Sequence, residues 1–214
     1  MIYKLKDIIY NYGSRKVLDI KNLQIEEGNI HVVSGANGSG KTTLLKIFNA
    51  LIKVPKGIIL FKDKPVEKDN IKLVRNNTVY VHQNPILFSG NVSDNVGYGL
   101  KIRKFPKDKI DQTVQQVLNL VGLQNFESRK SNNLSTGEIK RVAIARALAI
   151  NPEVLILDEP NAHMDRQSLE QIEQTFKDIN KIHNTTIIIS SHDSSFNNQI
   201  AHNIIMLEKG EIVS

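Results

Sequence analysis

The sequence predicts an α/β fold, and three observations carry that prediction. Short apolar runs alternate with segments that repeat apolar residues at helical spacing. Hydrophobic residues make up 40% of the chain and charged residues 23%, as in globular proteins. The length of 214 residues suits one domain, or one domain with two lobes. No apolar run approaches the roughly 20 residues that a membrane span needs. The first residues also lack a signal-peptide pattern, so we expect a cytoplasmic location.

Composition excludes several kinds of chemistry. The chain has no cysteine, which excludes disulfides, thiolate metal sites and cysteine nucleophiles. The net charge of +6 is compatible with nucleic acid, anionic lipid or phosphate ligands. The densest basic cluster, residues 101–109, contains one aromatic residue, Phe105, and matches no nucleic-acid motif. A solvated, lysine-rich surface is the commoner explanation, and we expect no nucleic-acid partner.

The first part of the chain predicts mostly strands. Residues 2–33 alternate as short strands, and the run 30–33 ends in a glycine-rich loop. A helix is expected from about 41 to 50, followed by strands at 57–61 and 78–82. Turns are expected at Tyr12-Gly13-Ser14, Glu27-Gly28-Asn29 and Lys62-Asp63-Lys64-Pro65.

The middle of the chain has a helical pattern. From about 91 to 123, apolar residues recur at steps of three and four and so share one helix face. We expect a helical lobe, at about 88–136, inserted into an α/β body made of 1–87 and 137–214. That body should continue with helices at 137–150 and 165–182, strands at 154–157 and 185–190, and a hairpin at 203–213 turning at Lys209-Gly210.

A glycine-rich loop carries the first chemical signal. Gly35-Ala36-Asn37-Gly38-Ser39-Gly40-Lys41-Thr42 fits the pattern G-x-x-x-x-G-K-[ST] between a predicted strand and a predicted helix. The glycines let backbone N–H groups turn inward toward phosphate oxygens, and the helix dipole favours the same anion. Lys41 should reach the β- and γ-phosphates, Thr42 should coordinate Mg²⁺, and Thr43 should touch the α-phosphate. A chance match is the competing interpretation, and the strand–loop–helix context disfavours it.

An apolar strand ending in two acids supplies the second signal. The run 154–157 delivers Asp158 beside Mg²⁺, as the acidic strand end of P-loop NTPases does, and Glu159 can polarise an attacking water. The competing interpretation is a solvated acidic pair. No guanine-reading N-K-x-D motif is present, so ATP is favoured over GTP.

The remaining motifs make the chain resemble the ATP-binding cassette family, the nucleotide-binding subunits of ABC transporters. Leu134-Ser135-Thr136-Gly137-Glu138 resembles the family signature L-S-G-G-Q, with Thr136 and Glu138 departing from it. Residues Asn161 and His163 are also unusual for the loop after Glu159. The resemblance covers essentially residues 1–214 as one domain. It implies a P-loop NTPase fold with a RecA-like mixed sheet, an N-terminal antiparallel β-subdomain and an inserted helical subdomain.

The resemblance also implies roles. Tyr12 would stack on adenine; the competing interpretation is a tyrosine that only ends a strand. Gln83 would reach Mg²⁺ and the attacking water, and His192 would contact the γ-phosphate and orient Glu159. In all, it assigns catalysis to Glu159, His192 and Gln83; cofactor binding to Tyr12, Gly35, Asn37, Gly38, Ser39, Gly40, Lys41, Thr42, Thr43, Ser135, Gly137 and Asp165; and metal binding to Thr42, Gln83 and Asp158.

The family signature implies a second copy of the chain. Ser135 and Gly137 would hold the γ-phosphate of ATP bound by the other subunit, in a head-to-tail dimer with two ATP molecules between the copies. Asp165 would couple the two sites. The competing interpretation of Ser135 is a helix N-cap.

Further partners follow from the same resemblance. A soluble ATPase of this kind would sit at the cytoplasmic face of the membrane, held by integral membrane permease subunits and working with a solute-binding protein. The loop 84–90 and the helical lobe would form the permease groove. The run 91–101 looks like importers of oxyanions such as tungstate and molybdate. An exporter ATPase, or a family member acting in DNA repair or translation, is the alternative. Those proteins usually carry a fused membrane domain, a coiled-coil insertion or two cassettes.

Overall fold

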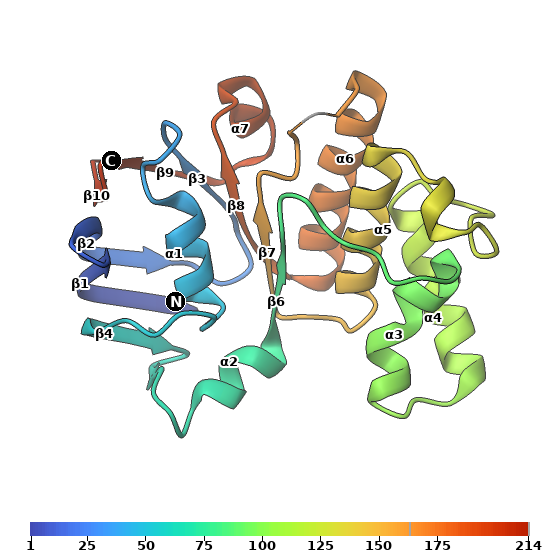
Figure 1. Cartoon of the computed structure of the whole chain (residues 1–214), viewed down its shortest axis with the longest axis horizontal. Helices are drawn as coiled ribbons and strands as arrows, with labels where there is room; N and C mark the ends of the chain where they lie inside the picture. Colours follow the sequence, from blue (N-terminus) through green and yellow to red (C-terminus); the bar gives the residue numbers. More distant parts are fainter. Residues whose placement is uncertain (163, 214) are drawn as a thin grey trace.

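The protein contains two sheets, seen in the computed structural model, which describes residues 1–162 and 164–213 (Figure 1). The smaller sheet is antiparallel, with strand order β2-β1-β4-β5. It pairs two strands from residues 3–25 with each other, and the first of these also pairs with a strand at 56–61. Its strands are β1 (Tyr3–Tyr12), β2 (Arg15–Ile25), β4 (Lys56–Phe61) and β5 (Lys64–Pro65).

The larger sheet has the order β10-β9-β3-β8-β7-β6. All its neighbouring strands are parallel except β10, which turns back on β9. Its strands are β3 (Ile30–Ser34), β6 (Thr78–Val81), β7 (Val154–Asp158), β8 (Thr186–Ser191), β9 (Asn203–Glu208) and β10 (Glu211–Ile212).

Both faces of the parallel sheet are covered, and β7 shows how. Val154 and Ile156 pack toward α1 (Lys41–Phe48) and the antiparallel sheet, whereas Leu155 and Leu157 pack with the helical side. Because successive strand residues point to opposite faces, an uninterrupted apolar run is what a strand buried on both sides requires. The helix α1 consequently lies between the two sheets (Figure 1).

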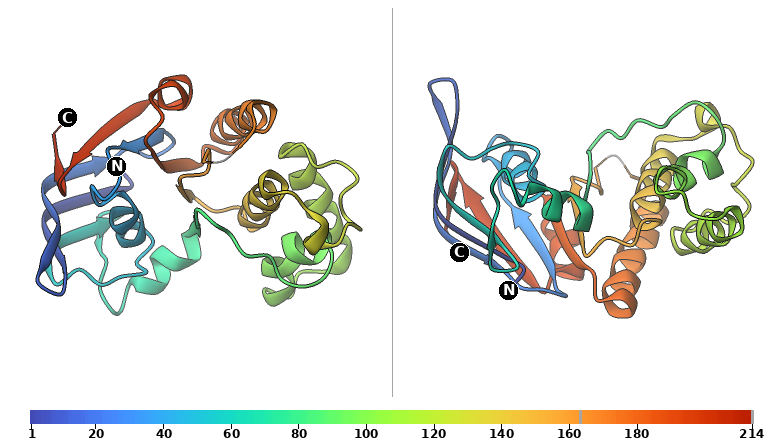
Figure 2. Two further views of the ribbon diagram at one scale, coloured as in Figure 1. Left: turned by 45° about the horizontal axis from the view of Figure 1, so that its top comes forward. Right: turned by 90° about the horizontal axis from the view of Figure 1, so that it is seen from below.

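The other helices lie mostly on the far face of this sheet. The two views of Figure 2 place α3 and α4, drawn in green, at the end of the molecule opposite the antiparallel sheet. None of the helices in the described ranges combines the length and apolarity needed to cross a bilayer. The helices are α2 (Ile71–Asn77), α3 (Val92–Ile102), α4 (Lys107–Leu120), α5 (Thr136–Leu148), α6 (Arg166–His183) and α7 (Ser194–Ile200), with a 3₁₀ turn at Ser131–Asn133.

The α/β class of the P-loop type is confirmed, and the differences from prediction are local. The helical segment 91–123 is two helices, because Lys104 has a φ of 59° and Pro106 precedes α4. The helix expected to reach residue 50 ends at Phe48, since Ala50 has a φ of 52°. Two short helices, α2 and α7, were not predicted. Helix α2 buries only Val74, so its sequence has almost no periodic signal.

A buried histidine makes stability depend on pH. His31 in β3 is 2% exposed, and its Nε2 lies 2.9 Å from the Glu26 carbonyl oxygen. Burial lowers the pKa of His31 below its usual value. The unfolded chain therefore binds more protons at acidic pH. We expect the free energy of unfolding to be unaffected well above pH ~6.5 and to fall below it, by at most about 1.4 kcal/mol per pH unit.

Urea unfolding at pH 7.5 and 5.5 measures this effect. His31→Gln should flatten the dependence, because an amide can donate to the same carbonyl without titrating. His183→Gln, at an exposed position of α6, is the control and should leave the wild-type slope. An undiminished acid loss in His31→Gln would assign the effect to other groups.

Candidate active site

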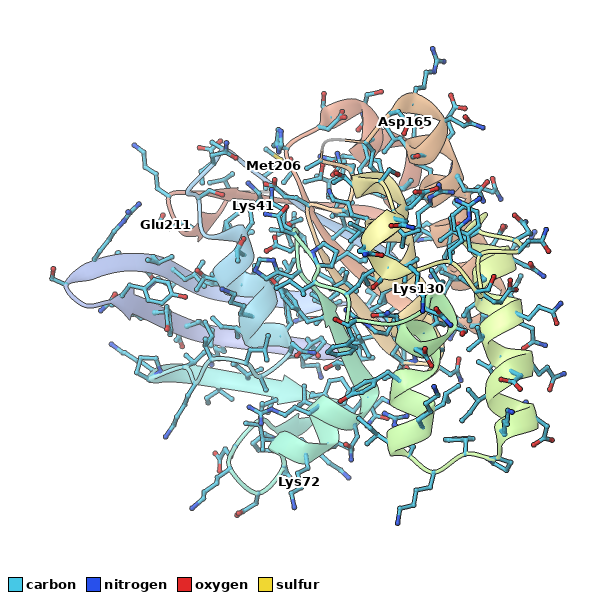
Figure 3. All side chains as sticks on the ribbon, turned by 45° about the vertical axis from the view of Figure 1, so that its right-hand side comes forward. Lys41, Lys72, Lys130, Asp165, Met206 and Glu211 are labelled. Carbon is cyan, nitrogen blue, oxygen red and sulfur yellow. The ribbon has the colours of Figure 1, made fainter. Side chains whose placement is uncertain are left out.

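The carboxyl ends of β3, β7 and β8 meet at one edge of the parallel sheet. There the loop 35–40 joins β3 to α1, which begins at Lys41 (Figure 3). Gly38 and Gly40 have φ angles of 79° and 111°, which side chains with a Cβ rarely adopt. The buried Ser39 hydroxyl has no hydrogen-bond partner among the described residues. The loop is thus shaped so that backbone and hydroxyl groups are available to a ligand.

Lys41 lies inside this loop. Its side chain is 5% exposed, and Nζ donates to the carbonyl oxygens of Gly35 at 2.8 Å and Ala36 at 3.1 Å. The same ammonium lies 3.8 Å from Oε1 of Glu159. A buried positive charge therefore occupies the centre of the phosphate loop and faces the acidic end of β7.

The carboxylate of Asp158 is held by three hydroxyl groups. Oδ1 accepts from Ser190 Oγ at 2.6 Å and from Thr42 Oγ1 at 3.1 Å, and Oδ2 accepts from the Tyr80 hydroxyl at 2.8 Å. Burial and the neighbouring Asp158 charge raise the pKa of Tyr80, so its hydroxyl stays a donor. With only donors around it, Asp158 is an oriented, acceptor-only carboxylate beside Thr42.

Glu159 turns back over the site because its backbone is left-handed, with a φ of 44°. Its N–H donates to the Ser190 hydroxyl at 2.9 Å. Its carboxylate accepts from Gln83 Nε2 at 3.0 Å, and Nδ1 of His192 lies 3.6 Å away. The structure therefore brings Gln83, Glu159 and His192 together from three separate loops.

Sequence reasoning missed Tyr80 and Ser190. Both lie in strands, and strand pairing places them against Asp158: Ser190 is its direct partner in β8, and Tyr80 comes from the neighbouring β6. A hydroxyl residue within an otherwise apolar strand was the available signal. Its meaning depends on strand order, which the sequence did not supply.

The signature segment forms a helix N-terminus. The Glu138 N–H donates to Ser135 Oγ at 3.3 Å, and the Ser135 N–H donates to Glu138 Oε2 at 2.7 Å. Glu138 is therefore the N3 residue of a capping box, a position that the glutamine of the family signature can also fill. A Cβ on Gly137 would come no closer than 3.4 Å to any neighbour, with Ser168 Oγ the nearest, which is ordinary van der Waals contact. The packing of this chain therefore does not by itself require glycine there.

Four expected site residues, Asp165, Ser135, Gly137 and Tyr12, stand apart from the Lys41–Glu159 cluster. Asp165 caps α6 by accepting from the Ser168 N–H at 2.9 Å and its hydroxyl at 2.8 Å, and these hydrogen bonds lower the pKa of Asp165. The signature at the start of α5 lies next to this cap, as the approach of Gly137 to Ser168 shows. Tyr12 is 50% exposed at the end of β1 and packs edge-on against Tyr10, with ring centroids 5.0 Å apart.

Comparison with known proteins decides the family. Residues 18–162 match the sequence profile of the ABC transporter family. The chain belongs to the ABC transporter family. It is 36% identical over 202 residues to the tungstate uptake system ATP-binding protein TupC of Peptoclostridium acidaminophilum, covering 94% of this chain and 92% of that protein. Relatives at 36–37% identity are named for energy-coupling factor, methionine import and spermidine/putrescine import.

Solved structures agree with this assignment of the cassette. The structure of cbiO1 from Clostridium perfringens, part of the ABC transporter complex cbiONQ, has a TM-score of 0.92 at 33% identity, covering 100% of this chain and 87% of that one. A dimeric ATP-binding cassette in a post-hydrolysis state, bound to ADP and Pi, has a TM-score of 0.88 at 30% identity, covering 99% and 97%. This ABC cassette is accordingly an ATP hydrolase that uses ATP and Mg²⁺.

The residues of the cassette fit both cofactors. The Ser39 hydroxyl, which has no partner in the described part of the chain, and the buried Lys41 ammonium suit phosphate oxygens. A Cβ at Gly38 would meet nothing within 4 Å, so the loop is open there to an approaching ligand. The hydroxyl of Thr42 and the carboxylate of Asp158, 3.1 Å apart, form the hard oxygen donor set that Mg²⁺ prefers.

Proposed function

We propose that this chain is the ATP-hydrolysing subunit of an importer and works as a head-to-tail dimer. The observation that carries the proposal is the separation of two half-sites within one chain. Lys41, Asp158 and Glu159 form one cluster, and the signature at Ser135 and Gly137 opens elsewhere, at the start of α5. A second copy, in the opposite orientation, would supply its signature to the phosphate loop of the first.

In this proposal the residues divide the work at one ATP. Lys41 and the backbone of 35–40 bind the phosphates, and Thr43, the next buried residue of α1, supports the α-phosphate end. Thr42, Asp158 and Gln83 would hold Mg²⁺, which would supply positive charge to neutralise the phosphates.

Glu159 orients water and accepts its proton, with its carboxylate aligned by Gln83 and His192. Tyr12 stacks on adenine from the exposed end of β1. Asp165, at the N-terminus of α6, meets the partner copy beside the signature. We also propose residues 1–87 and 137–214 as the catalytic body, with 88–136 as the signature lobe.

The permease would dock where the helical lobe meets β6. A groove of about 270 Å³ is lined by residues of the 79–86 segment, α3 and α5. Ile86 is 83% exposed at its rim, Phe88 packs against Tyr98 with the rings tilted and their centroids 4.5 Å apart, and Arg146 lies 5.1 Å from the Phe88 ring. An apolar floor with one arginine suits a short amphipathic permease helix. The chain would thereby be held, peripherally, at the cytoplasmic face of the membrane.

We further propose an oxyanion such as tungstate or molybdate as the cargo, delivered by a solute-binding protein. The likeness to the tungstate protein spans nearly the whole of both chains. Cells that lose this chain should lose tungstate uptake while methionine and spermidine uptake stay unchanged. If methionine or spermidine uptake is lost while tungstate uptake stays normal, the proposed cargo is wrong and the lost compound is the cargo.

Complementation tests the composite site. Ser135→Arg blocks the signature with a bulky cation, and Lys41→Ala removes the phosphate-loop charge, so each variant alone should be inactive. In a mixed dimer one site combines the intact phosphate loop of the first chain with the intact signature of the second. At equal mixing about half the dimers are mixed, each with one of two sites complete, so ATPase activity should return to at most about a quarter of wild type.

The control mixes Lys41→Ala with Glu159→Gln. Both lesions lie in the same half-site, so no mixed dimer has a complete site and activity should stay absent. Recovery in this control, or no recovery in the first mixture, contradicts the composite-site proposal.

A further inference from the structure

A buried lysine lies one turn into the signature helix. Lys140 of α5 is 4% exposed, and its Nζ donates to the backbone carbonyl oxygens of Ala162 and, at 3.4 Å, of Pro160. Among the described residues, no carboxylate oxygen lies within 4.0 Å of this ammonium. Its hydrogen bonds therefore go to the peptide backbone rather than to an ion-pair partner.

Those two carbonyls belong to the turn that follows the proposed catalytic carboxylate. The Ala162 N–H donates to the Glu159 carbonyl oxygen at 3.2 Å, which closes residues 159–162 into a turn. Glu159 itself has a left-handed φ of 44°, a conformation that surrounding contacts must hold in place. The Ser190 hydroxyl holds this turn at its start, through the Glu159 N–H, and Lys140 holds its far side.

Packing alone does not account for a lysine here. Burying an ammonium disfavours its charged form, and burial accordingly lowers the pKa of Lys140. A methionine of similar length would fill the same space without that desolvation cost, but it would leave the Ala162 and Pro160 carbonyl oxygens without this donor. What the lysine adds is donors directed at the backbone of the turn.

We infer that Lys140 is a positioning residue for Glu159: its ammonium fixes the 159–162 turn to the signature helix α5, so that the Glu159 carboxylate keeps its place between Gln83 and His192. This inference rests on the proposed role of Glu159. It assigns Lys140 no contact with ATP. Its loss should lower turnover without weakening nucleotide binding.

Two substitutions separate hydrogen bonding from packing. Lys140→Met keeps the length and apolar stem but removes the donors; kcat for ATP hydrolysis should fall roughly 10- to 100-fold, with KM within about twofold of wild type. Lys140→Gln retains an amide that donates to two carbonyls and should restore kcat to within about threefold of wild type. Lys177→Met, at an exposed lysine of α6, is the matched control and should behave as wild type.

A second measurement does not depend on activity. Amide hydrogen exchange of the 159–162 segment should quicken in Lys140→Met while α6 and β7 exchange as in wild type. Unchanged kcat and unchanged exchange in Lys140→Met overturn the inference. So does an equal loss of kcat in the Met and Gln variants together with a lowered Tm, because that pattern describes a purely structural lysine.

Glu159→Gln, assayed in parallel, separates the two proposals. Wild-type turnover in Glu159→Gln removes the proposed catalytic role itself. An inactive Glu159→Gln beside a fully active Lys140→Met leaves that role standing and removes only the positioning role of Lys140.

Discussion

Glu159→Gln is expected to lower kcat for ATP hydrolysis by roughly 10²- to 10⁴-fold while ATP still binds. The amide has nearly the same shape as the carboxylate. Its oxygen can therefore still accept from Gln83 Nε2, which lies 3.0 Å from the Glu159 carboxylate in the wild-type protein. What disappears is the negative charge that polarises water and accepts its proton. Lys41, 3.8 Å from Oε1, is untouched and continues to bind phosphate. Phosphate release measures kcat, and size-exclusion chromatography with Mg·ATP measures dimers.

The dimer measurement makes this prediction specific. Because the variant should not complete hydrolysis, ATP should accumulate between two copies and the dimer should persist. Glu170→Gln, at an exposed carboxylate paired with Arg166 on α6, is the matched control and should hydrolyse ATP normally. A Glu159→Gln protein that turns over at the wild-type rate contradicts the assigned role.

Lys41→Ala should weaken ATP binding by about tenfold to a hundredfold, the effect of removing a charged hydrogen bond of about 1.5–3 kcal/mol. The Lys41 ammonium donates to the Gly35 and Ala36 carbonyl oxygens. Phosphate oxygens would offer the same charge stronger, anionic acceptors. The alanine variant has no such group, and the loop's N–H groups alone remain to bind phosphate. Isothermal titration with Mg·ATP measures the affinity.

Lys72→Ala is the control for loss of a positive charge. Lys72 is exposed on α2, far below Lys41 in the view of Figure 3. Its removal should leave the affinity for ATP unchanged. Equal affinities of the Lys41→Ala and wild-type proteins would remove the phosphate-loop assignment, whatever the hydrolysis rate.

Local patterns accounted for most of the fold. The apolar runs at 154–157 and 185–190 became β7 and β8, and the hairpin near Gly210 forms as expected. Their apolar sequence predicted strands, since a strand covered on both faces must be apolar throughout. Helices α2 and α7 were not predicted because each is seven residues long, which is too short to show a periodic pattern.

For the candidate site, too, the sequence predicted the residues of continuous motifs and missed those brought together by the fold. The phosphate loop is one continuous stretch, so its residues and spacing could be recognised without knowing the fold. Tyr80, Ser190 and Lys140 could not be found that way. Tyr80 reaches Asp158 across 78 positions of sequence, Ser190 across 32, and Lys140 reaches Ala162 across 22. Each is an ordinary residue in its own segment. The contacts of Tyr80 and Ser190 with Asp158, and the proposed role of Lys140, depend on residues distant in the sequence.

The sequence alone predicted the α/β class, the glycine-rich phosphate loop and the acidic strand end, because each of these patterns depends on neighbours along the chain. Tertiary structure decided which groups orient the acids: the order β8-β7-β6 sets Ser190 and Tyr80 on either side of Asp158. It also decided that the signature helix lies against the turn after Glu159. Hydrogen bonds form over about 3 Å in space, whatever the separation of the two residues along the chain. These partners can therefore be identified only in the folded protein.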